Sequence, residues 1–124
     1  GLLPGDSGYD GSFKDIMQQM ITTLQNAGKI PVLLKIPIKY GESNSSPPYD
    51  DPGTAEDNLI IQEYNQVIDE LVAANGLAVT PPDLYTYFAL YPEEFHGNLH
   101  PNGLGYEAMA LLIYDALMES SLLP

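Results

Sequence analysis

The feature that most constrains the fold is a short, almost continuous apolar run, Ile30-Pro31-Val32-Leu33-Leu34-Lys35-Ile36. A run of this length that follows a helical pattern ending in glycine is typical of a strand buried on both faces of a parallel sheet. Pro31 has no N–H to donate to a ladder, so it is expected among the first residues of the strand. We therefore predict a buried parallel strand at Ile30–Ile36.

Helical patterns and a second short apolar run surround this predicted strand. Helices are predicted over Gly11–Ala27, over Ala55–Ala74 and from about Asn102 onward, because apolar residues recur there every three or four positions. Leu77–Thr80 predicts a second strand, and the aromatic segment Leu84–Tyr91 predicts a short helix. This alternation of helices and strands predicts an α/β domain with a parallel sheet and right-handed crossovers.

Two strands are too few for a stable sheet, and the strand at Ile30–Ile36 would be left with an open edge. The first residues, Gly1-Leu2-Leu3-Pro4, supply a loop and no strand. We therefore expect the strand at Ile30–Ile36 to pair with another chain or with a missing N-terminal segment. Residues 1–124 are interpreted as a single domain that lacks its first strands.

The charge of the chain excludes two classes of partner. Its 17 acidic and 4 basic side chains give a formal net charge of −13, so nucleic acid and anionic lipid would both be repelled. No run of about 18 apolar residues could span a bilayer, and no signal peptide is recognised. The chain has no cysteine, which excludes thiolate chemistry. Secretion or a periplasmic location is favoured, with the cytoplasm as the alternative.

A histidine stands in a rigid turn directly before the last predicted helix, in the sequence His100-Pro101-Asn102-Gly103-Leu104-Gly105-Tyr106. Pro101 biases His100 toward an extended conformation, Asn102 is a good N-cap, and the two glycines allow tight packing where the helix starts. An imidazole held in this way can act as a general base. The alternative is that His100 only flanks the helix, with its ring at the surface.

The order of several short blocks resembles the C-terminal half of the SGNH (GDSL-type) serine hydrolases. These blocks are Gly28-Lys29-Ile30-Pro31-Val32, Tyr64-Asn65, Pro82-Asp83-Leu84-Tyr85, and Leu99-His100-Pro101-Asn102-Gly103-Leu104-Gly105-Tyr106. The resemblance covers nearly the whole chain and implies a flavodoxin-like, three-layer α/β/α sandwich whose N-terminal strands are absent here. It also implies hydrolysis of a small-molecule, carbohydrate or lipid ester by a serine nucleophile, with His100 as the general base.

Most of the remaining machinery that the resemblance implies would lie upstream of this chain. The nucleophile of the family follows its first strand, and its oxyanion donors come from two further blocks. Gly5-Asp6-Ser7 spells the letters of the nucleophile block, but no strand precedes it, so we interpret Ser7 as a loop residue. Two other candidate nucleophiles, Ser45 and Ser46, lie in a polar loop predicted from Pro37 to Gly53.

The acidic member of the family's serine–histidine–aspartate triad is also replaced. The family generally has an aspartate three residues before its histidine, and that position here is Gly97. A main-chain carbonyl, Glu93 or Glu94 would then have to orient His100, and loss of the acid can lower the rate about 10⁴-fold. The alternatives to an enzyme are a non-catalytic α/β interaction or carbohydrate-binding module, or a truncated, inactive remnant.

Other candidate ligands lead to weaker predictions. His96 and His100 have the spacing of a helical metal pair, but Gly97 and Pro101 argue against a helix there, so no metal or other cofactor is predicted. The acidic pairs Asp50-Asp51 and Glu56-Asp57 are expected to be solvated and not to bind calcium. The sequence Asn44-Ser45-Ser46 fits a glycosylation acceptor. The aromatic segment from Tyr85 to Tyr91 is interpreted as a pocket lining or as part of the core.

Overall fold

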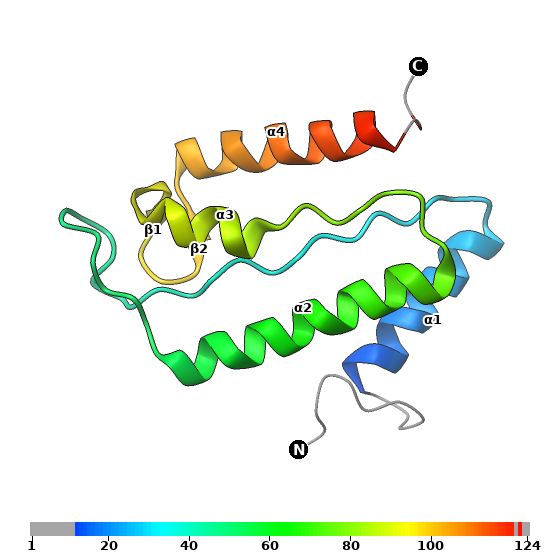
Figure 1. Ribbon diagram of the computed structural model, residues 1–124, viewed down its shortest axis with the longest axis horizontal. Helices are drawn as coiled ribbons and strands as arrows, with labels where there is room; N and C mark the ends of the chain where they lie inside the picture. The colour runs from blue at the N-terminus through cyan, green and yellow to red at the C-terminus, as the bar shows by residue number, and fades with distance from the viewer. Residues whose placement is uncertain (1–11, 121, 123–124) are drawn as a thin grey trace.

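The computed structural model describes residues 12–120 and 122, which fold mainly into helices (Figure 1). The helical elements are α1 (Phe13–Asn26), α2 (Ala55–Asn75), α3 (Leu84–Leu90), the 3₁₀ turn η1 (Pro92–Glu94) and α4 (Gly103–Glu119). Two short strands, β1 (Phe95–His96) and β2 (His100–Pro101), form an antiparallel hairpin between η1 and α4. The predicted helices are confirmed, and the predicted start of the first one at Gly11 lies outside the described residues.

Local side-chain caps explain where two of these helices begin and end. At the start of α2 the hydroxyl of Thr54 accepts a hydrogen bond from Asp57 N–H at 3.3 Å, and Gly76 ends the helix with a φ of 58°. At the start of α4 the side-chain oxygen of Asn102 accepts from Gly105 N–H at 3.1 Å. Each cap satisfies a backbone N–H that has no partner within the helix. The predicted N-cap role of Asn102 is therefore confirmed.

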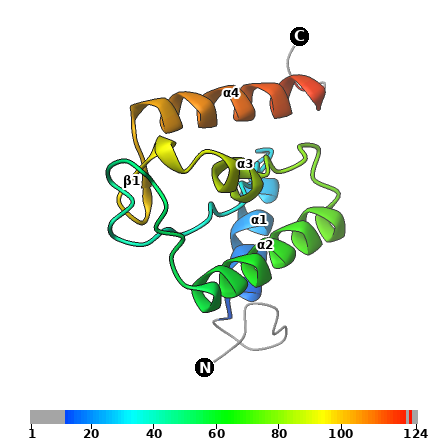
Figure 2. The ribbon, with the colours of Figure 1, turned by 60° about the vertical axis from the view of Figure 1, so that its left-hand side comes forward.

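The predicted α/β fold class is wrong for the described part of the chain, which contains no parallel sheet and no three-layer sandwich. Ile30–Ile36 and Leu77–Thr80 are not strands. Both are extended segments without regular secondary structure, and they run in the same direction between α2 and α4 (Figures 1 and 2). No backbone hydrogen bond joins one segment to the other, so neither has the ladder that a sheet requires. The predicted burial on both faces is also wrong for the first run, where Ile30 and Val32 are exposed and Leu33, Leu34 and Ile36 are half-buried.

Two asparagines of α2 bind the first of these segments in place of a neighbouring strand. The side chain of Asn65 accepts from Ile36 N–H at 2.7 Å and donates to Ile36 C=O at 2.9 Å. Asn58 makes the same two bonds to the backbone of Lys39, each at 2.9 Å. Both asparagines are buried, and a primary amide can donate and accept at once, as a peptide group does. The segment is therefore fixed along α2 by side chains.

We expect Asn65→Ala to lower the free energy of unfolding by about 2 kcal/mol, because it leaves a donor and an acceptor of Ile36 without partners. Urea denaturation followed by circular dichroism measures this loss. The control is Glu63→Ala, an exposed position on the same helix, which we expect to change stability little. Equal losses in the two variants would contradict the anchoring role of Asn65.

Buried apolar side chains form two clusters. The cluster between α1 and α2 contains Ile21, Val67 and Leu71, with Leu33 and Leu77 packed against it. The second cluster contains Tyr40, Leu84, Phe88 and Phe95, with Met109 and Leu112 of α4 packed against it. The second cluster therefore joins α3, the hairpin and α4 into the unit that carries His100.

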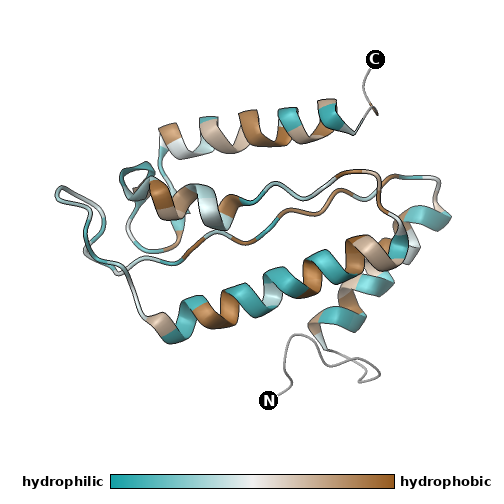
Figure 3. Ribbon diagram, in the orientation of Figure 1, coloured by the Kyte–Doolittle hydropathy of each residue, from teal (hydrophilic) through white to brown (hydrophobic). Residues whose placement is uncertain are grey.

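Several apolar residues of α1 and of the segment that follows it are exposed; Figure 3 shows the hydropathy of each residue along the ribbon. On α1, Ile16, Met20 and Leu24 have exposed fractions of 48%, 54% and 41%, and Ile30 after it has one of 57%. The apolar stripe predicted for the first helix is thus only partly covered by α2. Within residues 12–120, no helix is both long enough and apolar enough to cross a membrane.

Candidate functional site

His100 lies in the β1/β2 hairpin, directly opposite His96 in the antiparallel register. The neighbouring pair, Phe95 and Pro101, is turned the other way: Phe95 is buried and Pro101 half-buried, whereas both histidines are exposed. Successive side chains of a strand point to opposite faces, so the hairpin places its apolar face on the core and its two imidazoles toward solvent. The exposed hairpin was not predicted from the sequence, although the extended conformation of His100 was.

The position of His100 is fixed by the residues that follow it. Asn102 N–H donates to Glu94 C=O at 2.7 Å, and the side-chain amide of Asn102 donates to Glu93 C=O at 2.8 Å. A Cβ atom added to Gly105 would lie only 2.4 Å from the carbonyl oxygen of Glu94. The start of α4 therefore packs against η1 more closely than any other residue type would allow, which confirms the predicted role of this glycine.

The turn of the hairpin explains why glycine stands at position 97, where the family that the sequence resembles generally has an aspartate. This residue has a φ of 74°, in the left-handed region that costs most side chains about 1–2 kcal/mol. Glycine therefore suits the turn that reverses the chain between His96 and His100. An aspartate at this position, as in the family that the sequence resembles, would have to adopt the same backbone conformation.

Neither acidic candidate orients the ring of His100. Glu94 accepts a hydrogen bond from the hydroxyl of Tyr87 at 3.2 Å, and its other carboxylate oxygen is buried without a partner in the described part of the chain. Burial, followed by this contact with Glu94, raises the pKa of Tyr87 to about 12. Glu93 is exposed and contributes its backbone carbonyl to Asn102. Among residues 12–120 and 122, no side-chain hydrogen bond or ion pair involves the His100 ring.

Two of the three candidate serines, Ser45 and Ser46, lie within the described residues. Ser45 and Ser46 are exposed in the turn region after Gly41, and none of the hydrogen bonds found among the described residues connects either of them to His100. Ser7 lies outside the described residues. The interpretation of Ser7 as a loop residue and the location of the nucleophile outside the chain therefore stay predictions.

The candidate metal ligands do not assemble into a site of three or more side chains within residues 12–120 and 122. Asp57, expected to be solvated, instead forms an ion pair with Lys39 at 2.7 Å. A hydrogen bond from Lys39, and then one from Thr54, lowers the pKa of Asp57. Asp51 accepts from Ser43 N–H at 3.1 Å. These carboxylates thus stabilise the loop and the extended segment.

The candidate glycosylation acceptor is inaccessible in the folded chain. Asn44 has an exposed fraction of 0%, and its side-chain amide donates to Pro92 C=O at 2.9 Å. A glycan attached to that nitrogen would need solvent access and the loss of this bond. Asn44 therefore holds the loop against η1, and its predicted alternative role in glycosylation is wrong for the folded protein.

The aromatic segment divides between core and surface. Phe88 is fully buried, while Tyr91 has an exposed fraction of 40%. The hydroxyl of the buried Tyr40 donates to Phe88 C=O. Burial, with a smaller contribution from the charge of Glu93, raises the pKa of Tyr40 to about 12. Both interpretations of the segment therefore hold in part: Phe88 belongs to the core, and Tyr85 lines a pocket described below.

The raised pKa of Tyr40 predicts a loss of stability in alkali. An unfolded tyrosine ionises near pH 10, whereas Tyr40 keeps its proton in the fold up to about pH 12. Its contribution is complete below pH 10 and is lost as the pH rises to 12, by roughly 2 kcal/mol. We expect Tyr40→Phe to reduce this alkaline loss in urea titrations, whereas Tyr114→Phe on the exposed face of α4 leaves it unchanged. Identical pH profiles for both variants would contradict the assignment.

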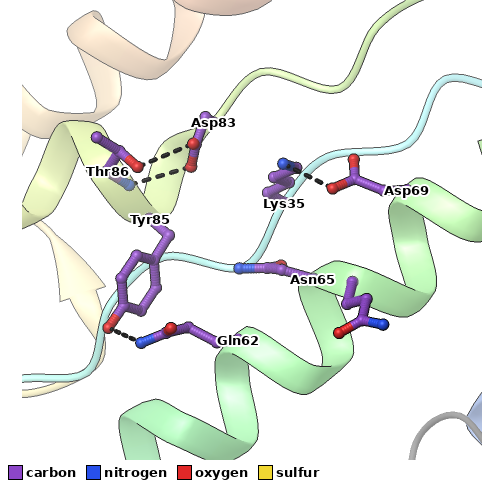
Figure 4. A pocket seen from close by; sticks show the side chains of 8 residues that line it. Lys35, Gln62, Asn65, Asp69, Asp83, Tyr85 and Thr86 are labelled. Atoms are coloured by element: carbon purple, nitrogen blue, oxygen red, sulfur yellow. Dashed lines mark hydrogen bonds and ion pairs between the residues drawn. The ribbon is translucent and has the colours of Figure 1, made fainter.

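A polar pocket that the sequence analysis missed lies between α2, α3 and the extended segment (Figure 4). Its volume is about 350 Å³. Its walls are formed by Lys35, Gln62, Asn65, Gln66, Asp69, Asp83, Tyr85 and Thr86. The spacing of Gln62, Gln66 and Asp69 along one face of α2 was a signal for this wall. The opposite wall comes from segments distant in sequence, and no local pattern indicates it.

The described residues thus contain two candidate functional sites, the exposed histidine hairpin and the polar pocket. Comparison with known proteins adds no family or relative to this description. No protein-family model, curated protein or solved structure matches the chain.

Proposed function

We propose that His100 is the general base of an ester hydrolase whose nucleophilic serine lies outside residues 1–124. The observation that carries this proposal is the exposed His100 ring in a hairpin held by Asn102 and Gly105. A base must be fixed in position and its ring must be free to accept a proton. The blocks that resemble SGNH hydrolases supply the reaction class.

In the proposed reaction, His100 accepts the proton of the serine hydroxyl as its oxygen attacks the ester carbonyl. The imidazolium then returns that proton to the departing alcohol, and a second cycle with water releases the acid from the serine. No acidic side chain in the described residues stabilises the imidazolium. We therefore expect slower catalysis than in enzymes with a complete triad.

The uncovered surface supports a second polypeptide segment as the source of the serine. The N–H groups of Val32, Leu33 and Leu34 have no hydrogen-bond acceptor among the described residues. Exposed apolar side chains, Ile30 and Val32 among them, accompany these unpaired groups. An extended segment of this kind favours pairing with another strand. We propose that such a segment, from another chain or from a missing N-terminal segment of the same polypeptide, pairs with Ile30–Ile36 and carries the nucleophile.

Labelling with a fluorophosphonate tests the proposal, because this probe phosphonylates an activated serine and releases fluoride. We expect labelling of the polypeptide as its gene encodes it, and loss of labelling in its His100→Ala variant. Residues 1–124 alone are expected to remain unlabelled. Labelling of that chain at Ser7, Ser45 or Ser46 would place the nucleophile within it and contradict the proposal. Failure to label the gene-encoded polypeptide would contradict the hydrolase itself.

A further inference from the structure

The polar pocket between α2 and α3 is separate from the histidine hairpin and has its own set of contacts. On one side Gln62 donates to the hydroxyl of Tyr85 at 2.9 Å, and on the other Lys35 pairs with Asp69 at 2.9 Å (Figure 4). Asp83 caps α3 at the rim, where it accepts from the backbone and hydroxyl of Thr86. These bonds hold the walls in place before any ligand binds.

The same side chains retain hydrogen-bonding capacity toward the pocket. Tyr85 accepts from Gln62, so its own hydroxyl proton is available, and the side-chain oxygen of Gln62 is available as an acceptor. Lys35 has further N–H groups and Asp69 a further oxygen beyond their mutual contact. Donors and acceptors therefore alternate around the pocket. A sugar hydroxyl both donates and accepts, so vicinal hydroxyls match this alternation.

The charges of the pocket and of the whole chain restrict the class of ligand that the pocket can bind. Lys35 is the only cationic residue of the pocket and is neutralised by Asp69, and the chain as a whole carries −13. An anionic ligand would meet no unpaired cation and an unfavourable field. All of the residues that line the pocket carry a polar or charged group, which makes it a poor match for a purely apolar ligand. The half-buried ring of Tyr85 offers the one aromatic surface on which the C–H face of a sugar can pack.

We infer that this pocket binds a neutral saccharide, with Tyr85 as the packing surface and with Gln62 and Asp69 as hydrogen-bonding groups. The site is independent of the proposed hydrolase reaction. Bound sugar would lie against α2 and α3, whereas the reaction would take place at the β1/β2 hairpin.

The inference is tested by titrating the isotopically labelled protein with cellotriose, xylotriose and chitotriose in separate NMR experiments. With at least one of them, we expect saturable amide shifts at residues 62–69 and 83–86, with a Kd of about 1 mM. Tyr85→Ala and Gln62→Ala are expected to raise that Kd about fivefold or more. Tyr114→Ala, which removes an exposed tyrosine of α4, should leave the Kd unchanged.

Three results of the sugar titrations would overturn the inference. These are no shift with any of the trisaccharides at about 10 mM, shifts located elsewhere on the protein, or an unchanged Kd in both pocket variants. Inorganic phosphate or spermidine shifting these amides where the sugars do not would also overturn it. Circular dichroism confirms that each variant is folded. His100→Gln should leave sugar binding intact, so failure here is distinguishable from failure of the hydrolase proposal.

Discussion

We expect His100→Gln to lower kcat/KM for p-nitrophenyl acetate by about 10²- to 10⁴-fold in the gene-encoded polypeptide, the range that a general base contributes. Glutamine keeps a polar side chain of similar reach but cannot accept and return the proton. The matched control is His96→Gln, because His96 is the directly opposed and also exposed residue of the same hairpin. We expect that control to keep nearly all of the activity.

The pair of variants separates a chemical role from a structural one. If both substitutions lowered kcat/KM equally, the hairpin and not the base would be the cause, and the proposal would be wrong. Added imidazole provides a further readout: in a His100→Gly variant, it should restore part of the activity by supplying the missing base. A variant that had only lost the hairpin structure would not respond to imidazole.

The helices were predictable because their signals are local. Caps at Thr54 and Asn102 and the left-handed Gly76 mark helix boundaries that the structure confirms. These residues act on backbone groups only a few positions away. Periodicity in the sequence therefore reports such elements without knowledge of the rest of the fold.

The parallel sheet was predicted wrongly because an apolar run does not reveal what binds its backbone. Ile30–Ile36 has the composition of a buried strand, but Asn65 supplies the backbone partner of Ile36 from a helix 29 residues further along the chain. The sequence shows Asn65 only as a polar residue in a helical pattern. Its burial and its two bonds depend on how α2 lies against the extended segment.

The candidate site was predictable in part for the same reason. His100, Asn102 and Gly105 act within one short stretch, so their roles followed from local geometry. The opposition of His96 and His100 depends on a turn at Gly97 that the sequence analysis treated only as a missing acid. The polar pocket combines three separate segments, so only the fold could reveal it.

The second large effect, on stability, is expected for Phe88→Ala, because Phe88 belongs to the apolar cluster that packs beneath the hairpin. Phe88 has an exposed fraction of 0%, and its ring meets that of Phe95 edge-on at a centroid distance of 4.9 Å. A Cβ at Gly105 would lie 3.2 Å from the Phe88 ring, so Phe88 also contacts the start of α4. Removing the ring leaves a cavity beneath the hairpin.

We expect Phe88→Ala to lower the free energy of unfolding by about 3–5 kcal/mol, a large share of the 5–15 kcal/mol typical of a folded domain. The control lies on the same helix: Leu90 has an exposed fraction of 70%, and Leu90→Ala should cost no more than about 0.5 kcal/mol. Urea denaturation measures both. Similar losses in the two variants would mean that α3 does not pack through Phe88, and the support of His100 by this cluster would have to be abandoned.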